Sequence, residues 1–230
     1  MEITNIIYLF LSVAIGAIIV EVFKPTKSKN IQLLLTFSGA YLLAVSVMHL
    51  IPELFNNKPS NNIGIFILGG FLIQILLEYF SKGIEHGHFN KQSVIPITVM
   101  ISLCIHALLE GIPLGGGHLH DHTQDALLTG IVLHKAPVSI VLFSFFLQSG
   151  MSKLKAYFFL LVFAIMAPLG VYLSYFYDLA IYANEIMAIV IGIFLHISTT
   201  ILFESTDGHK FSTIKIFAII TGSLLAIFSL

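Results

Sequence analysis

The chain has 230 residues, of which 57% are hydrophobic and 10% are charged, and its mean hydropathy is +0.96. A soluble domain carries about 25% charged residues, so this composition excludes a water-soluble enzyme and indicates a polytopic membrane protein. The net charge is −1, which provides no basic surface for nucleic acid. Cys104 is the single cysteine, which excludes disulfide frameworks and zinc sites built on several thiolates.

Eight apolar segments are long enough to cross a bilayer, which needs about 20 mostly apolar residues. They leave only short loops, so we expect an all-α fold in one transmembrane domain over residues 1–230. No basic residue precedes the first segment, so we interpret it as a retained span rather than a signal peptide. The expected spans are Ile3–Phe23, Ile31–Ile51, Asn62–Phe80, Val94–Gly115, Asp125–Ser149, Leu154–Phe176, Ile181–Phe203 and Phe211–Leu230.

The lysines, which account for all 11 basic residues, indicate the orientation. Lys58 follows span 2, and Lys135 lies inside span 5. The others all follow odd-numbered spans: Lys24, Lys27, Lys29, Lys82, Lys91, Lys153, Lys155, Lys210 and Lys215. Because lysine-rich loops stay in the cytoplasm, we expect a multi-pass protein of the cell membrane with both termini on the extracytoplasmic side.

Spans 2 and 7 carry a weak internal repeat. Span 2 contains Gly39-Ala-Tyr-Leu-Leu, and span 7 contains Gly192-Ile-Phe-Leu-His. The two spans cross the membrane in opposite directions, as inverted-topology repeats of transporters do.

Spans 4 and 5 contain polar residues that are costly at bilayer depth and therefore suggest function. His106 and Glu110 are four residues apart and share a helix face, while His134 falls near the middle of span 5. Two imidazoles and a carboxylate suit Zn²⁺, Fe²⁺ or a similar divalent ion. The alternative for a single histidine is a hydrogen bond between helices. Lys135 either pairs with Glu110 or fills the space of a second metal ion.

Proline and polar residues mark other positions on the spans. Pro113 and Pro137 each remove a helical hydrogen bond, so we expect bends in spans 4 and 5. His49 and Glu53 lie at the outer end of span 2, where they form either an entrance station for a cation or a polar helix end. Weaker candidates are Glu78, interpreted as an interfacial residue, and His196, inside span 7.

Histidines also cluster in two expected loops. His118, His120, Asp121 and His122 follow span 4 and form a candidate outer capture loop for a divalent cation. His86 and His88 follow span 3 on the cytoplasmic side and form a candidate delivery loop. The alternative is that both tracts are solvated loops without a ligand.

Five motifs in chain order resemble the ZIP family of divalent-metal transporters. They are Phe37-Ser-Gly-Ala-Tyr-Leu-Leu-Ala-Val-Ser-Val-Met-His-Leu-Ile-Pro-Glu53, His106-Ala-Leu-Leu-Glu-Gly111, His134-Lys-Ala-Pro-Val138, Ala167-Pro-Leu-Gly170 and Gly192-Ile-Phe-Leu-His196. The resemblance implies eight helices, with helices 1–3 and 6–8 as inverted repeats around helices 4 and 5. It also implies uptake toward the cytoplasm, frequent homodimers, and His106, Glu110 and His134 as metal ligands.

The chain departs from the family pattern at three positions. Members often bind two metal ions, but Ala107, Lys135 and Val138 occupy positions where those members carry ligands. The second site is therefore expected to be absent, with the Lys135 ammonium in its place. Water, His49 or another residue must complete the main site.

We therefore expect a Zn²⁺-preferring transporter that works by alternating access, with helices 4 and 5 moving relative to the repeats. The sequence contains no phosphate-binding loop, so we do not expect transport to be driven by ATP. The alternatives are an intramembrane metal-dependent hydrolase and a metal-sensing membrane protein. Ligand type does not rank Zn²⁺ against Fe²⁺, Mn²⁺ or Cd²⁺.

Overall fold

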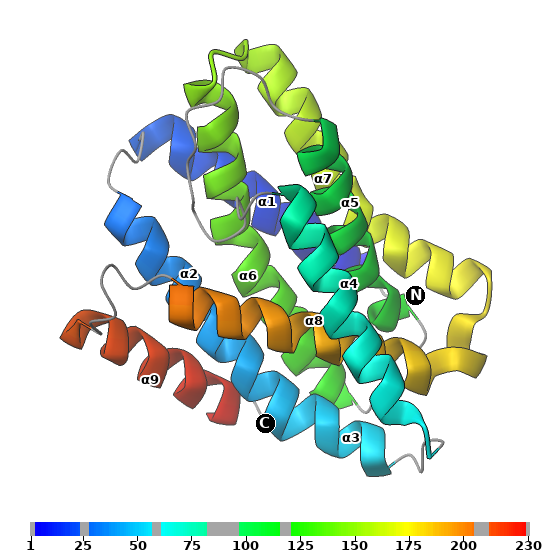
Figure 1. Cartoon of the computed structure of the whole chain (residues 1–230). Helices are drawn as coiled ribbons and strands as arrows, with labels where there is room; N and C mark the ends of the chain where they lie inside the picture. The colour runs from blue at the N-terminus through cyan, green and yellow to red at the C-terminus, as the bar shows by residue number, and fades with distance from the viewer. Residues whose placement is uncertain are drawn as a thin grey trace.

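A computed structural model describes residues 3–23, 28–56, 61–81, 97–115, 121–204 and 212–228. Within these ranges all regular structure is helical, which confirms the expected fold class (Figure 1). The α-helices are α1 (Ile3–Phe23), α2 (Ser28–Val45), α3 (Ile51–Asn56), α4 (Ile63–Ser81), α5 (Ile97–Gly111), α6 (Asp121–Gln148), α7 (Lys153–Phe176), α8 (Ala183–Glu204) and α9 (Thr213–Phe228). Shorter segments are the π-helix η1 (Ser46–Leu50) and the 3₁₀-helices η3 (Ile112–Gly115) and η4 (Leu179–Tyr182).

Each of the eight expected spans corresponds to helical structure. Seven stretches in the described part of the chain are long and apolar enough to cross a membrane. The last helix, α9, is apolar but has 16 residues. Large apolar side chains are exposed along α1, α4, α7 and α9, as expected where lipid rather than water surrounds the helices.

Two expected boundaries differ from the structure by four or more residues. Span 2 does not end at Ile51, because η1 and α3 continue the helix to Asn56. Pro52 has no N–H to bond the Met48 carbonyl, and the preceding turn widens so that the Ile51 N–H bonds the Ser46 carbonyl. Span 5 begins at Asp121 rather than Asp125, because its first turn is polar and gave no apolar signal.

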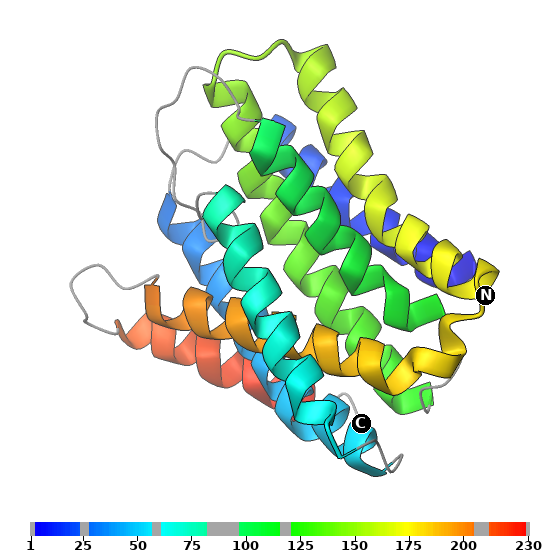
Figure 2. The same ribbon diagram turned by 45° about the vertical axis from the view of Figure 1, so that its right-hand side comes forward.

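The helices form two groups. One consists of α1, α5, α6 and α7, and the other consists of α2, α4, α8 and α9. In Figures 1 and 2 the green and yellow helices α5, α6 and α7 lie together, while orange α8 and red α9 lie beside α2. Contacts of α2 with α6 and of α4 with α5 join the groups.

The helix pairing has the symmetry of an inverted repeat. The contact of α1 with α6, which joins spans 1 and 5, corresponds to the contact of α7 with α5, which joins spans 6 and 4. Likewise, the contact of α4 with α8 has its counterpart in that of α9 with α2. Exchanging spans 1–3 for spans 6–8, and span 4 for span 5, therefore preserves the main contacts.

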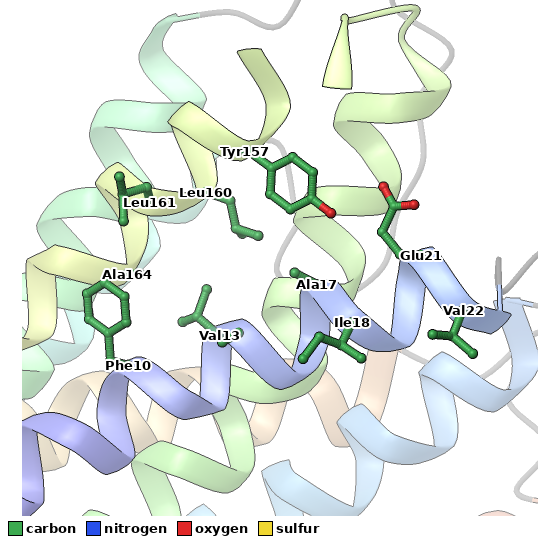
Figure 3. A pocket seen from close by; sticks show the side chains of 11 residues that line it. Phe10, Val13, Ala17, Ile18, Glu21, Val22, Tyr157, Leu160, Leu161 and Ala164 are labelled. Atoms are coloured by element: carbon green, nitrogen blue, oxygen red, sulfur yellow. The ribbon is translucent and has the colours of Figure 1, made fainter. Parts of the chain in front are cut away.

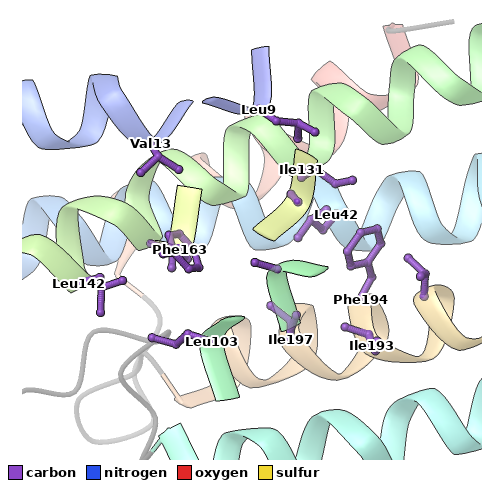
Figure 4. Packing of buried hydrophobic residues seen from close by; sticks show 14 of the residues in the cluster. Leu9, Val13, Leu42, Leu103, Ile131, Leu142, Phe163, Ile193, Phe194 and Ile197 are labelled. Carbon is purple, nitrogen blue, oxygen red and sulfur yellow. The ribbon is translucent and has the colours of Figure 1, made fainter. Parts of the chain in front are cut away.

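Glycines allow the closest of these helix contacts. A Cβ on Gly70 of α4 would collide with the Ile189 carbonyl of α8, and one on Gly192 of α8 would collide with the Ile67 carbonyl of α4. Small residues let helix backbones approach closely within a membrane. Apolar side chains such as Leu42, Phe163 and Phe194 fill the remaining interior (Figure 4).

Candidate metal site

Three buried side chains from α5 and α6 converge to form a candidate metal site. His106, Glu110 and His134 each offer a ligand atom, and these atoms all lie within 4.8 Å of one another. The side chains are only 1–2% exposed. The imidazole rings of the two histidines are 6.2 Å apart between centroids and nearly perpendicular. Two imidazole nitrogens and a carboxylate oxygen at this spacing can bind a first-row divalent ion.

Both oxygens of the Glu110 carboxylate have polar contacts. Oε1 lies 3.0 Å from Nε2 of His106, and Oε2 lies 3.1 Å from Nζ of Lys135. The Lys135 ammonium is 1% exposed and also lies 4.9 Å from the centroid of the Phe163 ring. The site therefore holds a buried carboxylate neutralised by a lysine of the same protein, within reach of two imidazoles.

Gln74 is a contact of the site that the sequence analysis missed. Its Oε1 atom on α4 lies 3.1 Å from Nδ1 of His106, and the side chain is fully buried. Glu78 follows one turn later on the same apolar helix. This pair of polar residues four apart is the sequence signal that could have pointed to a polar face on span 3.

The proposed entrance residues lie on other elements than the three potential ligands. His49, in η1, has Nε2 3.0 Å from the carbonyl oxygen of Ala226 on α9. Glu53, in α3, is 8% exposed. In the described part of the chain, neither belongs to the group of potential ligands around Glu110.

Most of the two histidine tracts lies outside the described residues. The histidines concerned are His86, His88, His118 and His120. Asp121 begins α6, and His122 is exposed on its first turn. The expectation that the outer tract is entirely a loop was therefore wrong for its last two residues. A helical first turn is compatible with an acidic residue there.

The two prolines have different local effects. Pro113 lies in η3, where the α-helical pattern of α5 gives way to a 3₁₀ turn. Pro137 lies inside α6, which continues as one α-helix through it to Gln148. Pro137 cannot donate a hydrogen bond to the carbonyl of Leu133, one residue before His134.

A second, partly buried polar pair joins α4 and α8. Oε2 of Glu78 lies 2.5 Å from Nε2 of His196, and the two side chains are 18% and 12% exposed. The ring of Phe71 packs edge-on against His196. Glu78 therefore has a specific partner within the helix bundle, and its interpretation as an interfacial residue was incomplete.

Comparison with known proteins supports the motif-based resemblance. Zinc transporter ZIP9-B of Xenopus laevis is 30% identical over 119 residues, covering 49% of this chain and 39% of that protein. Zinc transporter ZIP9 of Micropogonias undulatus is 29% identical over 119 residues, covering 49% of this chain and 38% of that protein. For ZIP9 of Macaca fascicularis the identity is 26% over 149 residues, with coverages of 54% and 63%. The chain spans less than two thirds of the length of these relatives.

The family model for "ZIP Zinc transporter" matches residues 83–229, which is more than half of the chain. The match includes the helices that carry His106, Glu110 and His134. The chain therefore belongs to the ZIP zinc transporter family.

Proposed function

We propose that the chain transports a divalent metal ion, preferentially Zn²⁺, toward the cytoplasm, and that His106, Glu110 and His134 bind the ion in transit. The observation that carries this proposal is the buried group of two imidazoles and one carboxylate within 4.8 Å. Family membership and the ZIP9 zinc transporters that the chain resembles support the metal as substrate.

Binding of the ion would rearrange the contacts of Glu110. Nε2 of His106 and Oε1 of Glu110 contact each other at 3.0 Å, so an ion must enter between them to bind both. A metal ion needs the lone pair of a neutral imidazole. Oε2 can keep its contact with Lys135, which leaves Oε1 and the two histidines as ligands. Water or another side chain would complete four-coordination.

The packing supports alternating access by movement of one helix group against the other. The ligands lie on α5 and α6 of the first group, whereas Gln74 lies on α4 of the second. From the sequence we expected spans 4 and 5 to move relative to both repeats. However, α5 packs extensively on α7 and α6 on α1, so we propose that these four helices move together.

Two other functions use the same residues. A hydrolase would employ the metal to activate water, but the family to which the chain belongs is one of transporters. A sensor would bind the metal without moving it. Flux across a membrane separates transport from both alternatives.

The test is zinc uptake into proteoliposomes that contain a zinc-sensitive dye. We expect His106→Ala and Glu110→Gln to abolish uptake while the purified variants elute as folded protein. Glu185→Gln is the matched control, because it makes the same carboxylate change at the start of α8, away from the site. Unchanged flux in both site variants would overturn the assignment, and zinc binding without flux in the wild type would indicate a sensor.

Three further properties belong to the same proposal. Uptake of Fe²⁺, Mn²⁺ and Cd²⁺ beside Zn²⁺ tests selectivity, and we expect Zn²⁺ to compete best. Since Cys104 is the single cysteine, a Cys104→Ser chain with a cysteine added at either terminus tests whether both termini are extracytoplasmic. Mass measurement in detergent tests the homodimer.

A further inference from the structure

A lipid-facing groove lies between α1 and α7, outside the metal site. It has a volume of about 480 Å³. Figure 3 shows Phe10 and Val13 of α1 on one side and Leu160 and Leu161 of α7 on the other. The walls are apolar along this length, so the groove accepts a hydrocarbon rather than an ion or a polar solute.

One end of the groove is polar. The Glu21 carboxylate accepts a hydrogen bond from the Lys153 ammonium at 2.8 Å, and the Tyr157 hydroxyl points toward Glu21 (Figure 3). Lys153 is the first residue of α7, and α1 ends two residues after Glu21. Because both helices have an end here, this part of the groove lies at the membrane interface, where lipid head groups are.

The length of the groove corresponds to one leaflet. Glu21 and Phe10 are both lining residues of α1, and the helix between them is about 17 Å long. The hydrocarbon core of a bilayer is about 30 Å thick, so one leaflet accounts for roughly half of it. The groove therefore extends from the head-group region to about the bilayer midplane.

We infer that this groove binds one phospholipid, with an acyl chain between α1 and α7 and its phosphate at Lys153. The ammonium has three N–H donors, of which one bonds Glu21, so others can reach a phosphate oxygen. The free N–H groups of the first turn of α7 also favour an anion there. The Lys153 charge balances that of Glu21, which reduces repulsion of the phosphate. This inference does not depend on metal transport.

The test uses the purified full chain titrated with palmitoyl-oleoyl-phosphatidylethanolamine, with bound lipid counted by native mass spectrometry. Ala14→Phe places a large side chain in the groove, and Ala218→Phe makes the same change on partly exposed α9 as its control. Lys153→Gln removes the ammonium that contacts the lining residue Glu21, and Lys155→Gln, an exposed lysine two residues later on the same helix, is its control.

We expect one lipid per wild-type chain, no retained lipid in Ala14→Phe, and about threefold weaker retention in Lys153→Gln, as for a partly exposed ionic contact. Both control variants should retain lipid as the wild type does. Equal retention in each variant and its control would overturn the inference, as would a wild-type dimer that Ala14→Phe converts to monomer without a change in bound lipid. Should Ala14→Phe fail to fold, the two lysine variants decide the outcome.

Discussion

Nδ1 of His106 lies 3.1 Å from Oε1 of Gln74, and this contact joins the two helix groups at the candidate metal site. An amide oxygen accepts a hydrogen bond, so Nδ1 of His106 carries a proton in this arrangement. Nε2 donates to Glu110 Oε1 at 3.0 Å, and a metal ion that displaces this proton would find the lone pair on the side of Glu110. Such outer contacts orient metal-binding histidines, and this one would change when the groups move.

The Gln74 contact predicts a variant with weakened metal binding. Gln74→Leu leaves the proton of His106 Nδ1 without its acceptor and frees the ring to rotate, so we expect about 10–100-fold weaker zinc affinity. Gln74→Glu keeps an acceptor and should restore most of it. Zinc titration of the purified variants measures the affinity, with the exposed Gln148→Leu as control. Wild-type affinity in Gln74→Leu would show that the contact does not orient the ligand.

Lys135 predicts a variant whose stability depends on zinc. Lys135→Met leaves the buried Glu110 carboxylate without its ammonium partner, which costs about 3–5 kcal/mol. Bound Zn²⁺ supplies positive charge at the same carboxylate, so zinc should raise the melting temperature of this variant more than that of the wild type.

Lys215→Met is the matched control for this experiment. Lys215, on α9, is also buried, but its ammonium donates to the Leu202 carbonyl of α8 at 3.1 Å. Neither helix carries one of the three potential ligands. Its loss should lower the melting temperature by an amount that zinc does not restore. Equal zinc responses in both variants would contradict a shared role of lysine and metal at Glu110.

The sequence predicted the helices and the three potential ligands for one physical reason. Apolar length defines a span, and charged or imidazole groups inside a span stand out against it. His106 and Glu110 also follow from helical spacing, because residues four apart share a face. That His134 lies beside them depends on how α5 and α6 pack, which the matching depth of these residues in neighbouring spans and the family motifs suggested.

The contacts that sequence reasoning missed depend on helix rotation and on local backbone changes. Gln74 and Glu78 indicate a polar face on span 3, but spacing alone does not show that this face lies against His106. His49 contacts α9 because η1 and α3 extend the second span. A continuous apolar pattern reveals neither how a helix is rotated nor where a π-turn changes that rotation.

The close contact between α4 and α8 predicts opposite results for two neighbouring glycines. Gly70→Ala places a methyl group against the Ile189 backbone, whereas the same group on Gly69 meets nothing within 4 Å. We expect Gly70→Ala to lose about 1–3 kcal/mol of stability and Gly69→Ala to be neutral or slightly stabilising. Thermal stability followed by size-exclusion chromatography measures the difference. Similar melting temperatures would show that the helices are less closely packed.

The Glu78–His196 pair predicts an energetic coupling between α4 and α8. Both side chains are partly buried, so Glu78→Leu or His196→Leu alone removes the polar partner that the other group has in this pair. We expect the double variant to lose less stability than the two single variants lose together. The difference, which is the coupling free energy of the pair, should be about 1 kcal/mol.

The exposed ion pair of Glu21 and Lys153 allows the same double-mutant cycle to be measured on a second pair of this protein. Its lysine is 66% exposed and its glutamate 27% exposed, and solvent-exposed ion pairs contribute about 0.2–1 kcal/mol. The cycle of Glu21→Gln and Lys153→Gln should therefore give a smaller coupling, and added salt should reduce it further. Because solvent screens the buried pair less, its coupling should persist at high salt. A coupling at Glu78 and His196 that salt removes equally would place that pair in a water-filled part of the protein.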